Sequence, residues 1–298
     1  MPANFRIAAI TDEFSPDIDT AARSMAEIGM TGAELRMVFG KNIASLTDEE
    51  LDRAIAIVRG HGLEIISIAS PLLKCVLPEA PEVDARFQKD MFASTQTYAD
   101  QPRLTARAFE IAKRTGARIV RVFSYWRTVR PEECFDRIVV ALGNLADQAA
   151  PLDLIIGLEN EHACNIATGE ETARLLAALD RPNLKVVWDP ANALVSGETP
   201  FPDGYRSLPP ERIVHVHAKD CQRENGKLVW GPLGEGVVDW TGQVEALARD
   251  GYTGWISLET HWPGPHGDKH EASMICGQNL KALAQTASLK RPPIDALP

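Results

Sequence analysis

Four short hydrophobic runs in the second half of this chain each end at a side chain that can bind a metal ion. The runs are residues 154–158, 185–188, 213–216 and 255–258, and they end at Glu159, Asp189, His217 and Glu259. By residue number, successive ends lie 30, 28 and 42 residues apart, which leaves room for a helix and a loop. Because repeated strand–helix units place their strand ends on one rim of a parallel sheet, the four side chains are expected to meet there.

The first half of the chain carries the same alternation of strands and helices. Strands are predicted over residues 6–11, 33–35, 65–69 and 118–123. Helices are predicted over residues 17–29, 47–60, 102–115, 131–149, 168–180, 240–250 and 271–287. The second of these opens on a capping box, in which Thr47 is followed three residues later by Glu50. With the four runs above, the pattern gives eight strands alternating with about eight helices.

Such an alternation predicts either an open doubly wound sheet or a closed barrel. No GxGxxG sequence follows the first strand, so a dinucleotide-binding half is not supported. A closed barrel gathers several strand ends around one mouth, which suits ligands at the ends of strands five to eight. We therefore predict a single (β/α)8 TIM barrel over residues 1–290. It has an irregular, partly helical insertion over the site at about 71–101 and a loose tail at 291–298.

Composition excludes several classes of protein. The net charge of −10 argues against binding to nucleic acid, which usually needs a basic face. No apolar run approaches the roughly 20 residues that span a bilayer, and no signal peptide is evident at the N-terminus. The five cysteines form no CxxC pair. These features favour a cytoplasmic protein that acts on a small molecule, away from membranes and nucleic acid.

Side-chain alternation along a strand assigns the histidine ligand. His217 is nearer the C-terminal rim, whereas His215 lies one layer deeper, where it supports the ligand or belongs to the barrel core. One imidazole with three carboxylates suits manganese or magnesium best and accepts cobalt or zinc. The sequence therefore predicts one divalent metal ion held by Glu159, Asp189, His217 and Glu259.

A divalent ion that chelates two adjacent sugar oxygens polarises the carbonyl group and stabilises an enediolate. A carboxylate can then remove the neighbouring C–H proton, and Glu159 and Glu259 stand on non-adjacent strands, so both are candidate acids and bases. Return of the proton to the opposite face gives an epimer, and return to the next carbon gives an isomer. Loss of a β-hydroxyl group gives dehydration. The metal ligands alone do not choose among these outcomes.

Four motifs carry a resemblance to the xylose isomerase-like barrel superfamily, which includes sugar isomerases, ketose 3-epimerases, hydroxypyruvate isomerase, inosose dehydratase and endonuclease IV. They are GLENE at 157–161, WDPAN at 188–192, HVHAKD at 215–220 and SLETH at 257–261. The resemblance implies the same four metal ligands, with Glu159 and Glu259 also acting as acid and base. It implies a substrate contact from Arg223, six residues after the ligand histidine. A substrate-binding histidine of the ketose epimerases is replaced here by Asn192, which departs from that pattern.

Other residues near these motifs are candidates for substrate contact. Lys219 can bind a substrate carboxylate, hydroxyl or phosphate, or it can pair with Asp220. Glu161 and His215 are also candidates. Glu34 and Arg36 end the second strand, where they could contact substrate, although we expect them to pair with each other. Trp230 is expected in the core or an oligomer contact, whereas His261 and Trp262 are candidates for the pocket wall. The glycine-rich loop at 231–236 is expected to shape the backbone beside the site.

Endonuclease IV needs many histidines on several loops, and the few histidines here exclude that member of the superfamily. The motifs favour a metal-dependent isomerase or epimerase of a sugar or sugar phosphate. A lyase that dehydrates a keto-polyol or cleaves a keto-sugar is the first alternative, and a non-catalytic sugar-binding barrel is the second. The resemblance also implies a homodimer or a homotetramer.

Overall fold

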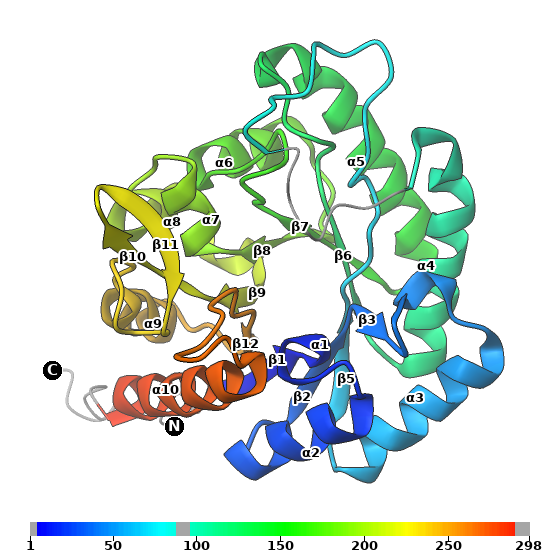
Figure 1. Ribbon diagram of the computed structural model, residues 1–298. Coiled ribbons are helices and arrows are strands. Elements are labelled where there is room, and N and C mark those ends of the chain that lie inside the picture. Colours follow the sequence, from blue (N-terminus) through cyan, green and yellow to red (C-terminus); the bar gives the residue numbers. More distant parts are fainter. Residues whose placement is uncertain (1–4, 88–95, 290–298) are drawn as a thin grey trace, which may run out of the picture.

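The computed structural model describes residues 5–87 and 96–289 of the chain. Its centre is a closed barrel of eight parallel strands, which confirms the predicted fold (Figure 1). The strands follow one another around the barrel in chain order, and the last pairs with the first. They are β1 (Arg6–Ile10), β2 (Gly32–Leu35), β5 (Glu64–Ile68), β6 (Ile119–Val122), β7 (Ile155–Glu159), β8 (Leu184–Trp188), β9 (Ile213–Ala218) and β12 (Trp255–Leu258).

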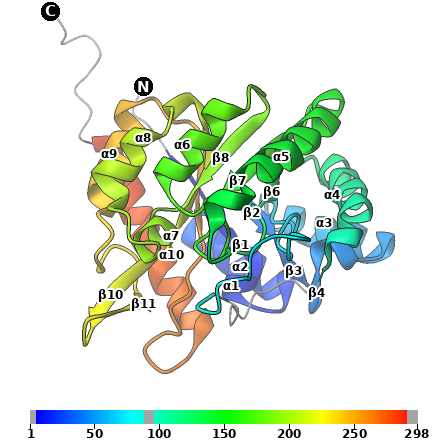
Figure 2. The ribbon, with the colours of Figure 1, turned by 90° about the horizontal axis from the view of Figure 1, so that it is seen from above.

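Helices surround the barrel on its outside (Figure 2). The longer ones are α2 (Ile18–Ile28), α3 (Asp48–Gly60), α4 (Gln101–Thr115), α5 (Phe135–Ala149), α6 (Gly169–Ala178), α9 (Trp240–Arg249) and α10 (Lys269–Leu289). Short helices are α1 (Thr11–Phe14), α7 (Pro190–Val195) and α8 (Tyr205–Ser207). Short 3₁₀ turns lie at Ile43–Ser45, Tyr98–Asp100, Pro131–Cys134, Ala150–Leu152 and Pro210–Arg212, and a π turn lies at Pro200–Gly204. Within the described residues, no helix combines the length and apolar character needed to cross a membrane.

The crossover from β8 to β9 has only short helices. Five prolines, at positions 190, 200, 202, 209 and 210, interrupt this stretch. Proline lacks a backbone N–H and is tolerated in the first turn of a helix but not in its interior, so Pro190 sets the start of α7. The consequence for the site is that α7 begins immediately after β8 and stays at the rim of the barrel.

The capping box predicted at Thr47 is present at the start of α3. The Thr47 hydroxyl accepts a hydrogen bond from the Glu50 backbone N–H at 3.2 Å, and the Glu50 carboxylate accepts one from the Thr47 N–H at 2.9 Å. Thr168 and Glu171 form the same reciprocal pair at the start of α6. Both boxes satisfy N–H groups that the first turn of a helix leaves without partners.

Replacing Thr47 by alanine should lower the free energy of unfolding by about 1 kcal/mol, because the Glu50 N–H loses its acceptor. For a chain of this size, that change corresponds to a fall in melting temperature of about 2 °C. Differential scanning calorimetry measures the shift. Thr47→Ser retains the hydroxyl and serves as the control, and an unchanged melting temperature in Thr47→Ala would show that the box contributes nothing.

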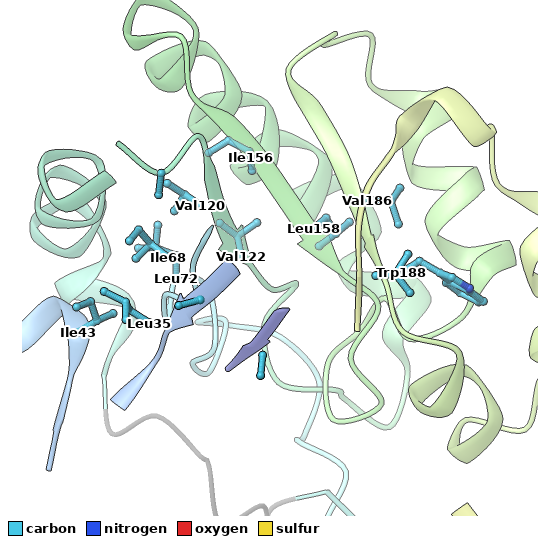
Figure 3. Close-up of a cluster of buried hydrophobic side chains, with 14 of the residues drawn as sticks. Leu35, Ile43, Ile68, Leu72, Val120, Val122, Ile156, Leu158, Val186 and Trp188 are labelled. Atoms are coloured by element: carbon cyan, nitrogen blue, oxygen red, sulfur yellow. The ribbon is translucent and has the colours of Figure 1, made fainter. Parts of the chain in front are cut away.

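The main hydrophobic core lies between the outside of the barrel and the helices. Figure 3 shows outward-pointing side chains from β2, β5, β6, β7 and β8 gathered in this layer, among them Leu35, Ile68, Val120, Leu158 and Trp188. Apart from apolar side chains such as Val187, Ile66 and Trp255, the inward faces of the strands carry mostly small or polar residues. These include Ala8, Glu34, Ser67, Arg121, Gly157, His215 and Ser257, all of them buried or nearly so. The barrel interior is therefore a polar layer beneath the C-terminal rim.

Two hairpins at this rim were not predicted. One consists of β10 (Asp220–Glu224) and β11 (Lys227–Gly231), and the other of β3 (Met37–Val38) and β4 (Lys41–Asn42). Asn225 and Gly226 at the tip of the first have φ angles of 50° and 78°, as a two-residue type I′ turn requires. The Asn-Gly pair in the sequence is the signal that could have predicted this hairpin.

The predicted insertion at 71–101 is only partly described, because residues 88–95 lie outside the described residues. Its described parts are mostly irregular. They include a bridge between Val83 and Thr128 and the 3₁₀ turn that precedes α4. Lys74 and Phe87 of this segment contact Glu161 and His162 at the rim. The predicted tail at 291–298 also lies outside the described residues.

Candidate metal centre

One side chain from each of four neighbouring strand ends meets the others at the C-terminal rim. Glu159 is the last residue of β7, Asp189 follows β8, His217 lies in β9 and Glu259 follows β12. One potential ligand atom from each lies within 4.8 Å of the others, and all four residues are buried. The structure thus brings together the four ligands predicted from the sequence.

The start of α7 orients Asp189. Its Oδ1 accepts a hydrogen bond from the Asn192 backbone N–H at 2.9 Å, which caps the short helix. This leaves Oδ2 buried and without a hydrogen bond. Lys219 Nζ lies 2.8 Å from Oδ2, an ion-pair distance without the angles of a hydrogen bond. Oδ2 therefore faces one cationic group, the Lys219 ammonium, and accepts no hydrogen bond.

His217 presents Nδ1 to the other ligands. This nitrogen lies 3.3 Å from Glu159 Oε1 and 3.2 Å from Glu259 Oε2. His215, two residues earlier on β9, lies one layer deeper as the alternation predicts, and its ring is fully buried. Its Nε2 lies 2.7 Å from Glu34 Oε1, and this contact favours a role in supporting the ligand layer.

Basic side chains hold the remaining oxygens of the two glutamates. Arg121 donates a hydrogen bond to Glu159 Oε2 at 3.0 Å, and Arg36 donates one to Glu259 Oε1 at 2.9 Å. Lys219 donates to Glu259 Oε2 at 3.1 Å. The two arginines fix one oxygen of each glutamate, so the other oxygen is directed toward His217 Nδ1.

The expected pairing of Glu34 with Arg36 is replaced by contacts to other groups. Arg36 binds Asp12 at 2.8 Å, as well as Glu13 and Glu259, whereas Glu34 lies against the two histidines of β9. Arg121 was missed as a partner of the site, and Arg36 was considered as a substrate contact or a partner of Glu34 but not as a partner of Glu259. The signal that could have identified Arg121 is a charged residue in the middle of a hydrophobic strand.

Burial and charge act in opposite directions on the ligand carboxylates. Burial by itself would raise the pKa of Glu259, but the charges of Lys219 and His217 bring that pKa well below its ordinary value. Burial likewise would raise the pKa of Glu159, and His217 and Arg121 lower it. The pKa of Asp189 is raised, because burial and the nearby glutamates outweigh Lys219. Asp189 is thus the ligand whose negative charge is least compensated by the protein.

These residues fit a divalent cation. Three carboxylates and one imidazole form an oxygen-dominated donor set of the kind that magnesium, manganese and zinc accept. The buried Asp189 Oδ2 lacks a hydrogen bond, and a bound cation would satisfy it. The cysteines, all free and buried, lie elsewhere in the fold.

A second group of polar side chains extends the site from Glu159. Asn192 donates a hydrogen bond to Glu159 Oε1 at 3.3 Å and lies 2.8 Å from His162 Nδ1. Glu161 contacts His162 at 2.8 Å and Lys74 at 3.4 Å. Lys74 is buried, and the sequence did not predict it as a residue of the site. Asn192 and Glu161 are therefore connected to the predicted ligands and to each other through His162.

An aromatic wall stands beside the ligands. Trp230, at the end of the β10–β11 hairpin, packs against His261 with ring centroids 4.8 Å apart and against His162 at 6.3 Å. Lys219 Nζ lies 5.5 Å from the centre of the Trp230 ring, and Phe87 packs against His162 at 5.9 Å. Trp230 thus packs against the core, one of the two places expected for it, and also contacts residues of the site, with His261 beside it.

Asp220 anchors the loop beside this wall. Its carboxylate accepts hydrogen bonds from the backbone N–H groups of Cys221, Gly234, Gly236 and Val238, at 2.8–3.1 Å. The alternative pairing of Lys219 with Asp220 is therefore wrong, because Lys219 turns to Asp189 and Glu259 instead. Arg223 lies on β10 and is exposed to solvent, and its predicted contact with substrate stays a prediction.

Comparison with known proteins gives one family match that spans most of the chain. Residues 22–280 match the family described as xylose isomerase-like TIM barrel. Among curated proteins, an inosose dehydratase from Geobacillus thermodenitrificans is 28% identical over 148 residues, which cover 45% of this chain and 49% of that protein. One from Lacticaseibacillus casei is 24% identical over 165 residues, covering 50% and 54%. The chain thus spans about half the length of the curated relatives it matches.

Three solved structures share the fold at low sequence identity. An IolI protein with a bound zinc atom is 17% identical, with a TM-score of 0.69 over 95% of this chain and 96% of that one. A xylose isomerase-like barrel from Mycobacterium smegmatis in complex with magnesium is 18% identical, with a TM-score of 0.67 over 96% and 97%. The 3-keto-D-glucoside 4-epimerase of E. coli is 16% identical, with a TM-score of 0.65 over 94% and 99%. At these identities the likeness establishes the fold.

Proposed function

The chain belongs to the xylose isomerase-like TIM barrel family, and from this premise we propose that it is a metal-dependent lyase that dehydrates an uncharged keto-polyol. Glu159, Asp189, His217 and Glu259 would hold the ion. The names of the curated relatives support dehydration. The sequence motifs favour isomerisation or epimerisation over dehydration, and the present proposal reverses that ranking.

The observation that carries the proposal is the position of Lys219. Its ammonium group touches Asp189 and Glu259 but is not in contact with Glu159, so the two sides of the ligand cluster are chemically unequal. Elimination of water needs one base for the C–H proton and one donor for the departing hydroxyl group. Epimerisation through two bases would instead need the donor to return a proton to the same carbon from the opposite face, so that no hydroxyl group leaves.

Each residue then has a defined part in the reaction. A bound divalent ion would polarise the substrate carbonyl group. Glu159, oriented by Arg121 and Asn192, takes the proton from the carbon beside the carbonyl. The electron pair of that C–H bond forms the new C=C bond as the β-hydroxyl group leaves. Lys219 donates the proton that converts this hydroxyl group into water.

The charge balance of the site supports an uncharged substrate. Each of the four basic side chains among the described residues of the site already contacts a carboxylate. The pairs are Arg36 with Glu259, Arg121 with Glu159, Lys74 with Glu161, and Lys219 with Asp189. A substrate phosphate or carboxylate would have to displace one of these buried partners, at a cost in free energy. The Trp230 wall supports this as well, because an aromatic face packs well against the apolar C–H surface of a polyol ring.

Incubation of the metal-loaded protein with an inosose in deuterated water tests the proposal. We expect a product that has lost one water molecule, detected by mass spectrometry, and no turnover of a phosphorylated keto-sugar. A product of unchanged composition that carries deuterium beside the carbonyl would show that the protein catalyses isomerisation and not dehydration. If neither deuterium exchange nor product is found with a panel of neutral keto-sugars, the proposed enzymatic activity is contradicted. The alternative of a non-catalytic sugar-binding barrel would then be favoured.

Isomerisation or epimerisation is the second candidate. The observation in its favour is that Glu159 and Glu259 both contact His217 Nδ1, from strands that are not adjacent. Two carboxylates on different sides of one site could exchange a proton between the faces of a substrate. The deuterium experiment separates this candidate from dehydration.

Replacing Lys219 by methionine should lower kcat by about 100-fold, because the departing hydroxyl group loses its proton donor. Lys219→Arg should remain slow, because a guanidinium group keeps the positive charge but does not give up its proton. Steady-state kinetics with the substrate that the protein dehydrates measure the change in kcat. Lys185→Met, at the opposite end of the barrel on β8, is the control, and an unaltered kcat in Lys219→Met would contradict the assignment.

A further inference from the structure

Glu34 contacts the metal centre from across the barrel. It lies near the end of β2, which is separated from β9 by β12 and β1, and it has no exposed surface. Its Oε1 lies 2.7 Å from His215 Nε2 and 3.2 Å from His217 Nε2, and its Oε2 lies 3.5 Å from His217 Nε2. A carboxylate buried this deeply is tolerated only where it has such partners.

The two nitrogens of His217 therefore face different groups. Nδ1 faces Glu159 and Glu259, and Nε2 faces Glu34. A histidine that binds a metal through one nitrogen keeps its proton on the other, and the partner of that proton fixes the tautomer and the ring orientation. We propose that Glu34 is the positioning residue that keeps the His217 proton on Nε2 and so reserves Nδ1 for the metal ion.

His215 fixes Glu34 in turn. Its Nε2 makes the shorter of the contacts to Oε1, and its ring stands nearly perpendicular to that of His217, with the planes at 85° and the centroids 5.3 Å apart. The carboxylate is thus held between two imidazoles and cannot rotate without breaking one contact. This gives a reason for the His-x-His pattern: His217 binds the metal, and His215 holds the group that orients it.

Glu34, His215 and His217 could also be regarded as a second metal site, since their ligand atoms lie close together. Two observations favour the positioning role. The 2.7 Å contact between Glu34 and His215 is a normal hydrogen-bond distance. A second ion on His217 Nε2 would also require that ring to give up both its protons, because its Nδ1 faces the first site.

Metal titration by calorimetry tests the assignment without any measurement of turnover, so its outcome does not depend on the proposed reaction. With Mn²⁺, wild-type protein should bind one ion per chain. Glu34→Ala should bind it about 10- to 100-fold more weakly, the usual loss when such a partner is removed. Glu34→Asp should recover part of the affinity. Ser67→Ala is the matched control, because Ser67 pairs with Glu34 in the sheet, is buried and has no hydrogen-bond partner for its hydroxyl.

A spectroscopic measurement on wild-type protein keeps the proposal testable if Glu34→Ala does not fold. In the zinc-loaded protein, two-bond ¹H–¹⁵N spectra should show a retained proton on His217 Nε2 and none on Nδ1. A proton on Nδ1 would overturn the proposal. So would an unchanged Mn²⁺ affinity in folded Glu34→Ala, or two ions per wild-type chain with one lost in that variant.

Discussion

Glu159→Gln should lower turnover by about 10² to 10⁴-fold, the range that a general base contributes, while the chain remains folded. The amide retains an oxygen that can bind a cation, but it cannot accept the substrate proton. Arg121 and Asn192 each donate a hydrogen bond to one oxygen of Glu159, so the glutamine amide keeps one of these bonds and turns its NH2 group toward the other donor. Steady-state kinetics and deuterium exchange at the carbon beside the carbonyl measure the loss.

Glu259→Gln gives the comparison that separates the two candidate reactions. In a dehydratase with Glu159 as the base, Glu259→Gln should retain exchange at the substrate carbon. In a two-base epimerase, each variant should lose the exchange that its own carboxylate carries out. Exposed Glu170→Gln, in the first turn of α6, is the control for an unrelated loss of one charge. Full turnover in Glu159→Gln would remove this residue from the mechanism.

Removal of the metal ion by a chelator should abolish turnover and lower the melting temperature. A ligand that binds only the folded state at 100 times its dissociation constant stabilises that state by about 2.7 kcal/mol. For a chain of this length, that corresponds to a fall of about 4 °C on its removal. The physical source is the loss of the cation from among three buried carboxylates, of which Asp189 is the least compensated.

Calorimetric scans with and without chelator measure this shift, and addition of Mn²⁺, Mg²⁺ or Zn²⁺ should restore both stability and turnover to different extents. Asp189→Asn should show a smaller response to the chelator, because it lacks one charged ligand. Identical melting temperatures with and without chelator in a protein shown to contain one ion would contradict a stabilising metal centre.

The sequence predicts the barrel and the location of its ligands because both depend on local patterns. Strands are marked by hydrophobic runs, and each ligand stands at the end of one run. The choice of His217 over His215 follows from the two-residue repeat of a strand, and the structure places His217 at the rim. Only the order of a few residues along a single strand is needed for these predictions.

The partners of the ligands could not be predicted in this way. Glu34 meets His217 across the barrel, and the register of β2 against β5 shifts between Ala33 and Glu34. That shift is set by packing of the closed sheet, and the alternation of residues does not reveal it. Lys74 and Arg36 likewise belong to segments that follow a strand, whose paths depend on tertiary contacts.

The anchoring of the rim by Asp220 has a consequence for how such a barrel diversifies. One carboxylate, next in sequence to Lys219, ties down the base of the β10–β11 hairpin and the glycine-rich loop through four backbone groups. Because these bonds involve main-chain atoms, the side chains along the hairpin are free to vary without releasing the anchor. The exposed tip at Asn225 and Gly226 can also be lengthened, since it lies beyond every one of these bonds. The chain therefore separates a segment whose side chains can vary from the lysine that pairs with Asp189 and Glu259.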